Sequence, residues 1–257
     1  MDRHVDFERI ENFRDFGGYD TACGRGLRRG RLFRSGHHHT ATPADLQKLR
    51  DLGVEVIVDL RGATEREREP SRRFDGFDGL VIQSDIPAVG PEWLSRIAGA
   101  PLTAEWFFED SMAGYRRNPF EPRHIELFSR FLRAVGERDG AVVVHCAAGK
   151  DRTGLACAFL HHLAGVAYED IVADFLLTND ESRIARKIEA SGAYLERTIG
   201  WRPSEDALRA ASSVFAEHLD AAFDEIRARC GSVDGYLETV LGVDAELRGR
   251  IHGRVLG

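Results

Sequence analysis

The sequence has few cysteines, few lysines and no long apolar run, and each scarcity excludes a class of protein. Its four cysteines are widely spaced in 257 residues and form neither a Cys-x-x-Cys pair nor the spacing of a zinc site. No segment approaches the roughly 18 apolar residues of a membrane span. The first ten residues also lack the apolar stretch of a signal peptide. We therefore predict no integral membrane segment and no metal site.

Charge and composition limit the partners and the domain count. The net charge is -7, which gives no general reason to expect nucleic acid or an anionic membrane as a partner. The cations are almost all arginine, and the sequence has only three lysines, Lys48, Lys150 and Lys187. No Pro- or Ser-rich linker interrupts the chain, so we predict a single domain over residues 1–257.

The most informative stretch runs from Ala141 to Gly154 and reads AVVVHCAAGKDRTG. Its first four residues are apolar and rich in β-branched side chains, which predicts a buried strand. From Thr153 onward apolar residues recur at helical spacing. The strand and the helix are joined by the tight loop of residues 146–152, whose backbone amides can converge on one anion together with the helix N-terminus. We expect this 146–152 loop to bind phosphate through Ala147, Ala148, Gly149 and Lys150.

The side chains of this stretch carry nucleophilic chemistry. Cys146 starts the loop, where the amides and the positive end of the helix would stabilise a thiolate. Arg152 closes it with a planar fork that can bind two phosphoryl oxygens. Thr153 could donate its hydroxyl to the sulfur, and His145 could orient the loop through its ring nitrogens. A second Cys-x5-Arg match at Cys23 has no flanking strand or helix, which indicates a basic turn.

The segment from His145 to Gly154 resembles the phosphate loop of the bacterial tyrosine phosphatase-like family with dual protein and lipid activity, a branch of the cysteine-dependent phosphatases. In that family Lys-Asp precedes the arginine, as it does here. Further stretches of the chain resemble the same family, namely Asn12–Tyr19, Gly30–Gly36, Val58–Arg61, Phe175–Asn179 and Gly231–Tyr236. The resemblance implies a tyrosine phosphatase-like fold, a phosphotyrosine or phosphoinositide substrate, and the absence of any cofactor.

The remaining pattern predicts an α/β fold with a mainly parallel central sheet flanked by helices. Thr42 and Asp45 form a capping box before a helix over residues 43–52. We expect strands at 32–33, 54–60 and 80–82, and a helix at 124–135. The helical C-terminal third, about 168–257, should contain helices at 168–178, 180–198, 204–230 and 232–255.

Residues 92–120 contain many aromatic residues in an amphipathic helical pattern. Aromatic stripes of this kind usually pack on a sheet, whereas the resemblance implies lid helices over the phosphate site. In the second case Arg116, Arg117 and Arg123 would line the path of an anionic substrate.

Several other charged residues allow two interpretations. Asp59 and Arg61 end a strand and either brace the loop or form a local salt bridge. Arg14 and Asp15 suggest a structural ion pair. The charged segment 63–73 is expected to be a solvated helix face. His37, His38 and His39 lack partners at metal-ligand spacing and are expected in a solvated loop.

The general acid is the least determined role. Asp151 lies in the loop itself, at the position that serves as the acid in the resembled family, and a bound phosphate would raise its pKa. Asp85 and Asp110 are rivals from other segments, and the sequence has no Trp-Pro-Asp motif. Lys150 offers a second cation that suits a polyanionic head group, although loop lysines are usually exposed to solvent.

These observations predict a phosphomonoester hydrolase that acts through a phosphocysteine on phosphotyrosine, on phosphoinositides, or on both. Two alternatives stay open. One is an arsenate reductase-like enzyme, which would need resolving thiols near the loop, with Cys157 the nearest candidate. The other is a phosphate-binding module without turnover. An oxidisable thiolate suits a reducing compartment, so we expect a cytoplasmic protein, although members of the resembled family can be exported without a visible signal.

Overall fold

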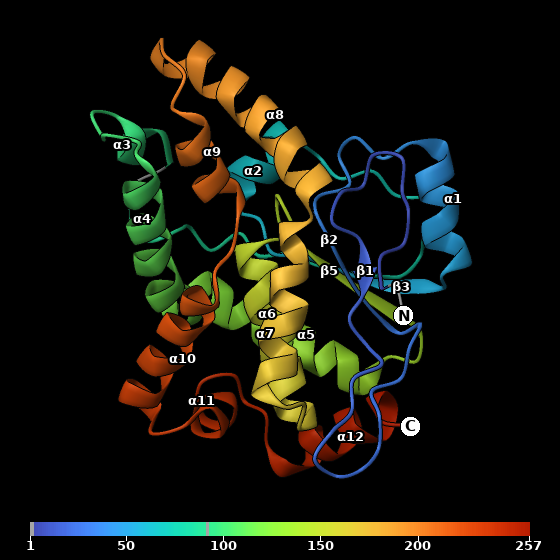
Figure 1. The fold of residues 1–257 in the computed structure, drawn as a ribbon. Coiled ribbons are helices and arrows are strands. Elements are labelled where there is room, and N and C mark those ends of the chain that lie inside the picture. The colour runs from blue at the N-terminus through green and yellow to red at the C-terminus, as the bar shows by residue number, and fades with distance from the viewer. Residues whose placement is uncertain (1–2, 91–92) are drawn as a thin grey trace.

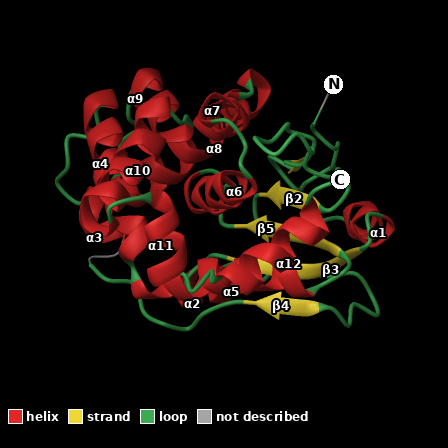
Figure 2. Ribbon diagram, turned by 90° about the horizontal axis from the view of Figure 1, so that it is seen from below, coloured by secondary structure: helices red, strands yellow, loops and turns green. Residues whose placement is uncertain are grey.

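The computed structural model describes residues 3–90 and 93–257. Its centre is a five-stranded sheet with the strand order β1-β2-β5-β3-β4. The first pair is antiparallel and the other pairs are parallel, which confirms the predicted mainly parallel sheet (Figures 1 and 2). The strands are β1 (Arg14–Asp15), β2 (Leu32–Ser35), β3 (Val54–Asp59), β4 (Leu80–Ile82) and β5 (Ala141–His145).

Helices cover both faces of the sheet and build the C-terminal part of the chain. Those before the loop are α1 (Pro43–Asp51), α2 (Ala63–Arg68), α3 (Trp93–Ile97), α4 (Ala104–Arg117), the 3-10 helix η1 (Asn118–Phe120) and α5 (Pro122–Glu137). Those that follow are α6 (Asp151–Ala164), α7 (Tyr168–Leu176), the 3-10 helix η2 (Leu177–Asn179), α8 (Glu181–Ile199), α9 (Glu205–Ser212), α10 (Ala216–Cys230), α11 (Val233–Thr239) and α12 (Ala245–Val255).

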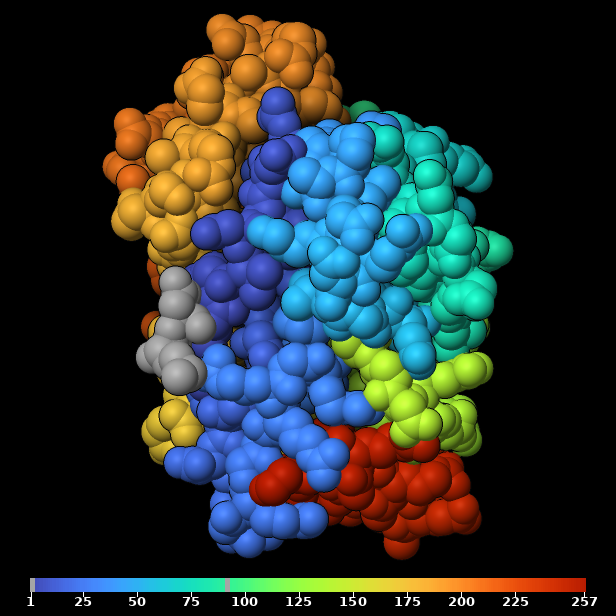
Figure 3. All heavy atoms as spheres, turned by 90° about the vertical axis from the view of Figure 1, so that its right-hand side faces the viewer, coloured from blue at the N-terminus to red at the C-terminus, as the bar shows by residue number. Residues whose placement is uncertain are grey.

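The strand side chains alternate between two buried layers, because successive residues of a strand point to opposite faces. On one face Phe33, Ile57 and Val143 pack against α1 and the N-terminal segment. The N-terminal segment and α1 form the outer side of the molecule seen in Figure 3, where they lie above the C-terminal helix. On the opposite face Val142 and Val144 pack under α5, α6 and the last helices. A buried core on both faces explains the continuous apolar run of β5.

The register of the parallel strands gathers their polar ends at one edge. Ser35 of β2 and Asp59 of β3 both lie opposite His145, the last residue of β5. Ligands of parallel α/β sheets bind beyond the carboxyl ends of the strands. The 146–152 loop begins at this edge, so the sheet brings the ends of three strands to the candidate site.

Local signals predicted several elements correctly. The helix α1 has the capping box expected from the sequence, because Thr42 accepts a bond from the Asp45 amide and Asp45 accepts one from the Thr42 amide. The strands at 54–60 and 80–82 and the helix at 124–135 are present as β3, β4 and α5. The predicted helical pattern over 92–120 forms α3, α4 and η1, while residue 92 itself lies outside the described residues.

Two predicted helices are wrong, because each is broken in the structure. The helix expected over 204–230 ends at Ser212, and α10 begins only at Ala216. Asn179 binds the connecting segment, accepting from the Val214 amide at 2.9 Å and donating to the Val214 carbonyl at 2.7 Å. The helix expected over 232–255 is interrupted at 240–244, where Gly242 has φ +69° and Asp244 caps the next helix.

One apolar cluster connects the beginning and the end of the chain. It contains Phe16 near the N-terminus, Phe159 of α6, and Leu256 after α12, together with the inner faces of α5, α10 and α11. None of the described helices is both long enough and apolar enough to cross a membrane.

Candidate active site

The 146–152 loop joins β5 to α6 as the sequence predicted, and its carbonyl groups point away from the loop centre. The Ala147 carbonyl accepts from the His37 amide at 3.1 Å. The Asn12 side chain donates to the carbonyls of Ala148 and Gly149 at 3.3 and 2.8 Å. In the described part of the chain, the amides of residues 147–152 find no acceptor. With the carbonyls held outward, these amides and the N-terminus of α6 remain available to one anion.

Gly149 is the position where this loop requires glycine. Its φ is +65°, a conformation that L side chains rarely adopt. A Cβ atom built here would lie 2.4 Å from the carbonyl oxygen of Ser35. The loop therefore rests directly on the end of β2, and this contact places it over the edge of the sheet.

Cys146 lies at the floor of the loop and is 2% exposed. Ala147 and Ala148 are half-buried, and the side chain of Asp151 is 35% exposed, so these residues form the rim. The predicted hydrogen bond from Thr153 to the sulfur is absent. The Thr153 hydroxyl is buried and has no partner among the described residues. The arrangement is a thiol beneath a ring of free amides.

Arg152 is held by Glu65 from α2 through two hydrogen bonds. Its Nη1 donates to Glu65 Oε2 at 2.7 Å, and its Nη2 donates to Glu65 Oε1 at 2.8 Å. Burial alone would lower the pKa of Arg152, but the Glu65 carboxylate outweighs it and, with Cys146 and Asp151, raises the pKa. The segment 63–73 is therefore not simply a solvated helix face, because one of its carboxylates fixes the arginine of the loop.

Behind the loop, His145 and Asp59 link the ends of β5 and β3. The His145 ring is buried, its Nε2 lies 3.8 Å from Asp59 Oδ2, and it stacks on His38 with ring centroids 4.6 Å apart. Asp59 also accepts two bonds from Arg61, at 2.9 and 2.7 Å. The local salt bridge of Asp59 and Arg61 is present, whereas His145 Nε2 has no hydrogen-bond partner among the described residues, so a bracing role for this pair stays a prediction.

The three adjacent histidines have separate partners. His37 Nε2 lies 3.8 Å from Glu69, His38 Nε2 lies 3.1 Å from the Ser35 hydroxyl, and His39 Nδ1 lies 3.1 Å from the Pro70 carbonyl. His38 is fully buried, unlike the solvated loop residue that was expected.

A buried ion network supports the loop from the other side. Arg34 of β2 donates to Asp174 Oδ2 at 2.8 Å and to the Gly149 carbonyl at 3.1 Å. Arg14 lies 3.6 Å from the same carboxylate and donates to Asn12 at 2.6 Å. The predicted pair of Arg14 with Asp15 is wrong, because Asp15 instead accepts from backbone amides. Asp174 is 1% exposed, so its single carboxylate is a buried countercharge that the two guanidiniums share.

Asp151 is bound by Tyr115 from α4 and lies close to the ammonium of its neighbour Lys150. Tyr115 of α4 donates to its Oδ1 at 2.9 Å, and Lys150 Nζ lies 3.5 Å from that oxygen. Burial raises the pKa of Asp151, but Lys150 and the Tyr115 hydroxyl outweigh it, so the pKa is lowered in the ligand-free protein. The rivals are paired elsewhere, Asp85 with Arg66 and Asp110 with Arg96.

Lys150 is neither exposed nor directed at the loop centre. Its ammonium donates to the carbonyls of Ala211 and Ser213 at 2.7 and 3.2 Å, and the residue is 7% exposed. The side chain ties the loop to the break between α9 and α10. Its contact with a substrate head group would require these bonds to be exchanged, so in this arrangement only its amide faces the anion site.

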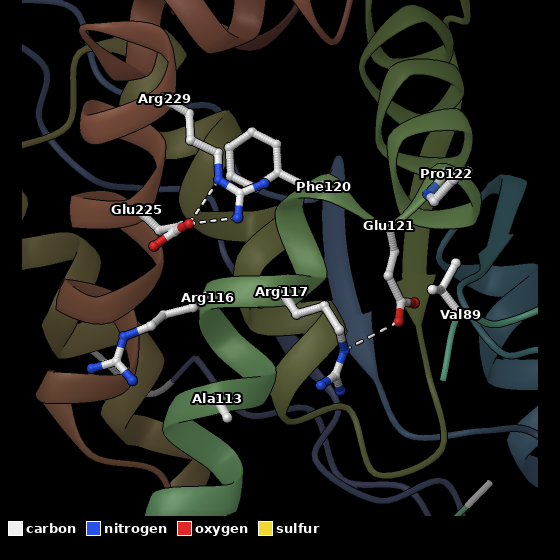
Figure 4. A pocket seen from close by; sticks show the side chains of 9 residues that line it. All are labelled: Val89, Ala113, Arg116, Arg117, Phe120, Glu121, Pro122, Glu225 and Arg229. Atoms are coloured by element: carbon white, nitrogen blue, oxygen red, sulfur yellow. Dashed lines mark hydrogen bonds and ion pairs between the residues drawn. The ribbon is translucent and has the colours of Figure 1, made fainter. Parts of the chain in front are cut away.

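The three arginines expected along a substrate path lie in two different parts of the structure. Arg116 and Arg117 line a cleft of about 490 Å³ between α4, the start of α5 and the end of α10 (Figure 4). Arg117 is paired there with Glu121 at 3.3 Å, and Glu225 is paired with Arg229. Arg123 is buried instead, 3.7 Å from Glu121, and its charge contributes to lowering the pKa of Glu65.

The residues that hold the loop from distant parts of the sequence were not predicted. Asn12 and Arg34 bind its carbonyls, and Asp174 holds Arg34 in turn. Asn12 and Arg34 lie in stretches that carry the family resemblance, which was a usable signal. Glu65 had no such signal, and the signal for Tyr115 was limited to the lid helices that the resemblance implied over residues 92–120. Their positions relative to the loop depend on how α2 and α4 pack.

A thiol beneath free amides, with a fixed guanidinium in the first turn of the following helix, defines a cysteine-dependent phosphatase. The comparisons with known proteins agree with this class. The model of the tyrosine phosphatase family matches residues 5–257, and the chain belongs to that family.

The chain is similar to named phosphatases over nearly its whole length. A relative from Cupriavidus necator, named provisionally as a tyrosine-protein phosphatase, is 34% identical over 95% of this chain and 86% of its own length. The triple specificity protein phosphatase PtpB of Mycobacterium tuberculosis is 29% identical over 96% of each chain. A tyrosine-protein phosphatase of Nostoc commune is 33% identical over 53% of this chain and 44% of its own. The protein is therefore a phosphomonoester hydrolase of the tyrosine phosphatase family.

Proposed function

We propose that Cys146 is the nucleophile that takes the phosphoryl group from a phosphorylated protein or lipid. Its sulfur attacks phosphorus, the bond from phosphorus to the leaving oxygen breaks, and a phosphocysteine forms. Water then attacks phosphorus, which releases phosphate and returns the thiolate. The observation that supports this proposal is the 146–152 loop, whose carbonyls at 147–149 are bound by other segments while its amides have no acceptor among the described residues.

Arg152 and the loop amides are proposed to hold the transferring group. Glu65 and the Leu60 carbonyl occupy both N–H groups of Nη1, and Glu65 takes one of Nη2. The Nε–H and the second N–H of Nη2 remain, and these two lie on one edge of the guanidinium, which suits two phosphoryl oxygens. The amides of Ala147, Ala148, Gly149 and Lys150 supply the other donors.

Asp151 is proposed as the general acid. In the resting protein its pKa is lowered, so the carboxyl is ionised near neutral pH. A bound phosphate dianion places negative charge beside Asp151 and raises its pKa. The Asp151 carboxyl therefore takes up a proton when the substrate binds. We expect Asp151→Asn to lose far more rate on phosphates with poor leaving groups than on p-nitrophenyl phosphate. Equal losses would assign the acid to another residue.

The enzyme is tested by turnover of p-nitrophenyl phosphate. We expect Cys146→Ser to abolish turnover and Arg152→Lys to reduce it strongly, because lysine keeps the charge but lacks the fork. Acid quenching of the wild type with a 32P-labelled substrate should trap label on Cys146. Robust turnover by Cys146→Ser would contradict the mechanism, whereas a wild type without turnover would be a phosphate-binding module.

The substrate is proposed to be phosphotyrosine, a phosphoinositide, or both. Cys146 lies at the floor of the loop, so a phosphate carried on a long or flat group reaches the sulfur more easily than one on a short side chain. We therefore expect phosphoserine to be a poor substrate. Rates on phosphotyrosine, phosphoserine and phosphoinositide panels would rank these classes.

An arsenate reductase is disfavoured by the positions of the other thiols. Burial raises the pKa of Cys157 to about 12, so this thiol stays protonated. Cys23 lies in a turn whose neighbour Ala22 bonds to Gly165, at the end of α6 that is opposite to Cys146. The 14 residues of α6 span about 20 Å, too far for a disulfide. Arsenate-dependent thiol consumption would contradict this inference.

We also infer that residues 1–257 act as one phosphatase domain, because the apolar cluster joins Phe16 to Leu256. Over the described part of the 92–120 segment, α4 reaches the site through Tyr115, which supports a covering role for it. Limited proteolysis tests both points. A single protected fragment is expected, and early cleavage into two stable halves would contradict it. The reducing compartment expected for Cys146 stays a prediction.

A further inference from the structure

The two oxygens of the Asp151 carboxylate have different surroundings. Oδ1 accepts from the Tyr115 hydroxyl at 2.9 Å and has Lys150 Nζ at 3.5 Å. Within residues 3–90 and 93–257, no hydrogen-bond or ion-pair partner is found for Oδ2. Since the side chain is partly exposed at the rim of the loop, its free oxygen is the one that can reach a substrate.

We propose that Tyr115 is a positioning residue for the general acid, holding Oδ1 so that Oδ2 carries the proton to the leaving oxygen. The inference rests on the proposed function, because it assumes that Asp151 is the acid. As the phosphorus–oxygen bond breaks, the Oδ2–H bond breaks and the leaving oxygen gains that proton. In the second step the attacking water gives a proton back to Oδ2, and the sulfur leaves as the thiolate.

The packing of Tyr115 explains why it can position another side chain. The residue is 1% exposed, and its ring stacks on His218 of α10 with centroids 4.8 Å apart. The same ring makes a T-shaped contact with Phe175 of α7, with centroids 6.0 Å apart. Burial and the Asp151 carboxylate raise the pKa of Tyr115 well above 10, so its hydroxyl remains a donor. A ring fixed on two sides leaves the hydroxyl little freedom to move.

The sign of the pH effect follows from the groups that face Asp151. These are Lys150 and Arg152 of the loop, Tyr115 of α4, His218 of α10 and Arg183 of α8. Burial lowers the pKa of His218 to about 4, so this ring is neutral at pH 7. A hydroxyl that donates to a carboxylate favours its ionised form. Removing the Tyr115 hydroxyl should therefore raise the pKa of Asp151.

The test is Tyr115→Phe, which keeps both ring contacts and removes only the hydroxyl. On phenyl phosphate, whose leaving group needs a proton, we expect kcat to fall about 10-fold to 100-fold. On p-nitrophenyl phosphate, whose leaving group needs little assistance, kcat should fall less than about 3-fold. Activity declines where the acid loses its proton, so the alkaline limb of the pH–rate profile should move to higher pH. In an Asp151→Asn background, Tyr115→Phe should cause no further loss.

Tyr236→Phe is the matched control. Tyr236 is also fully buried, and its hydroxyl donates to the Pro119 carbonyl at 2.6 Å rather than to the site. We expect this variant to lose stability without any dependence of its rate on the leaving group. Equal losses on both substrates by Tyr115→Phe, or an additive loss in the Asp151→Asn background, would overturn the positioning role.

A ring-fluorinated tyrosine at position 115 keeps the test decisive if Tyr115→Phe does not fold. Its more acidic hydroxyl donates more strongly, so the alkaline limb should move to lower pH, opposite to the shift in Tyr115→Phe. An unchanged profile would overturn the proposal. Its failure is distinguishable from that of the proposed function, because Cys146→Ser would still be inactive on both substrates.

Discussion

Glu65 holds both terminal nitrogens of Arg152, at 2.7 and 2.8 Å. The carboxylate comes from α2, which follows β3, while the arginine lies in the first turn of α6 after β5. Side chains that bind a transition state are most effective when their orientation is fixed in advance. The pair therefore makes α2 a part of the candidate site, although none of its residues is expected to touch the substrate.

The first prediction concerns Glu65→Gln. Glutamine has one acceptor and no charge, so Arg152 should lose the two-point hold and sample other rotamers. We expect kcat/KM on p-nitrophenyl phosphate to fall about 10-fold to 100-fold, the range of one lost charged hydrogen bond. Glu67→Gln is the control, because Glu67 is exposed on the same helix. Equal activity of the two variants would show that the pair does not orient Arg152.

The second prediction is the acid sensitivity of the fold. Burial would raise the pKa of Glu65, but Arg152 lowers it to about 2, and Arg14 and Arg34 likewise lower that of Asp174 to about 2. Each group stabilises the folded state above its unfolded pKa of about 4, and that stabilisation is lost as the pH falls from about 4 towards 2. Urea midpoints measured across this range should fall steeply, and less steeply in Glu65→Gln. Parallel curves would contradict the assignment.

The third prediction is that Asp174→Asn destabilises the whole domain. This side chain is 1% exposed and balances Arg14 and Arg34, so its loss leaves two buried guanidiniums without a countercharge. We expect the free energy of unfolding to fall by about 3–5 kcal/mol, measured by urea denaturation. Glu169→Gln, an exposed change in the first turn of the same helix, should cost less than about 1 kcal/mol. If Asp174→Asn lowers the free energy of unfolding by less than Glu169→Gln does, the ion network does not contribute to the stability of the fold.

The fourth prediction separates two glycines by their surroundings. Gly149→Ala should abolish activity and lower stability, because φ is +65° and the new Cβ would lie 2.4 Å from the Ser35 carbonyl. Gly253→Ala is the comparison, since nothing lies within 4 Å of its Cβ position in α12, and the change should stabilise the protein by about 0.5–1 kcal/mol. Thermal melts and turnover of p-nitrophenyl phosphate measure both effects. An active Gly149→Ala would show that the loop can relax.

The parts of the site that are built from neighbouring residues of the sequence could be predicted from local patterns. The strand, the 146–152 loop and the start of α6 needed only local patterns, and the capping box at Thr42 needed only two side chains three residues apart. The predicted helix over 204–230 failed for the opposite reason. The carbonyls between Ala211 and Val214 are bound by Lys150, Arg183 and Asn179. These partners are distant in the sequence, so no local pattern in the segment could predict the break.

Local patterns were enough to predict the chemistry of this protein, because the residues of the 146–152 loop are contiguous and are flanked by an apolar strand and the start of a helix. The folding of the whole chain sets which side chains orient the residues of the loop. Glu65 reaches Arg152, and Tyr115 reaches Asp151, only after α2 and α4 have packed around the sheet. Packing is set by the sum of many weak contacts rather than by any local pattern, and for that reason these two partners could be found only in the folded molecule.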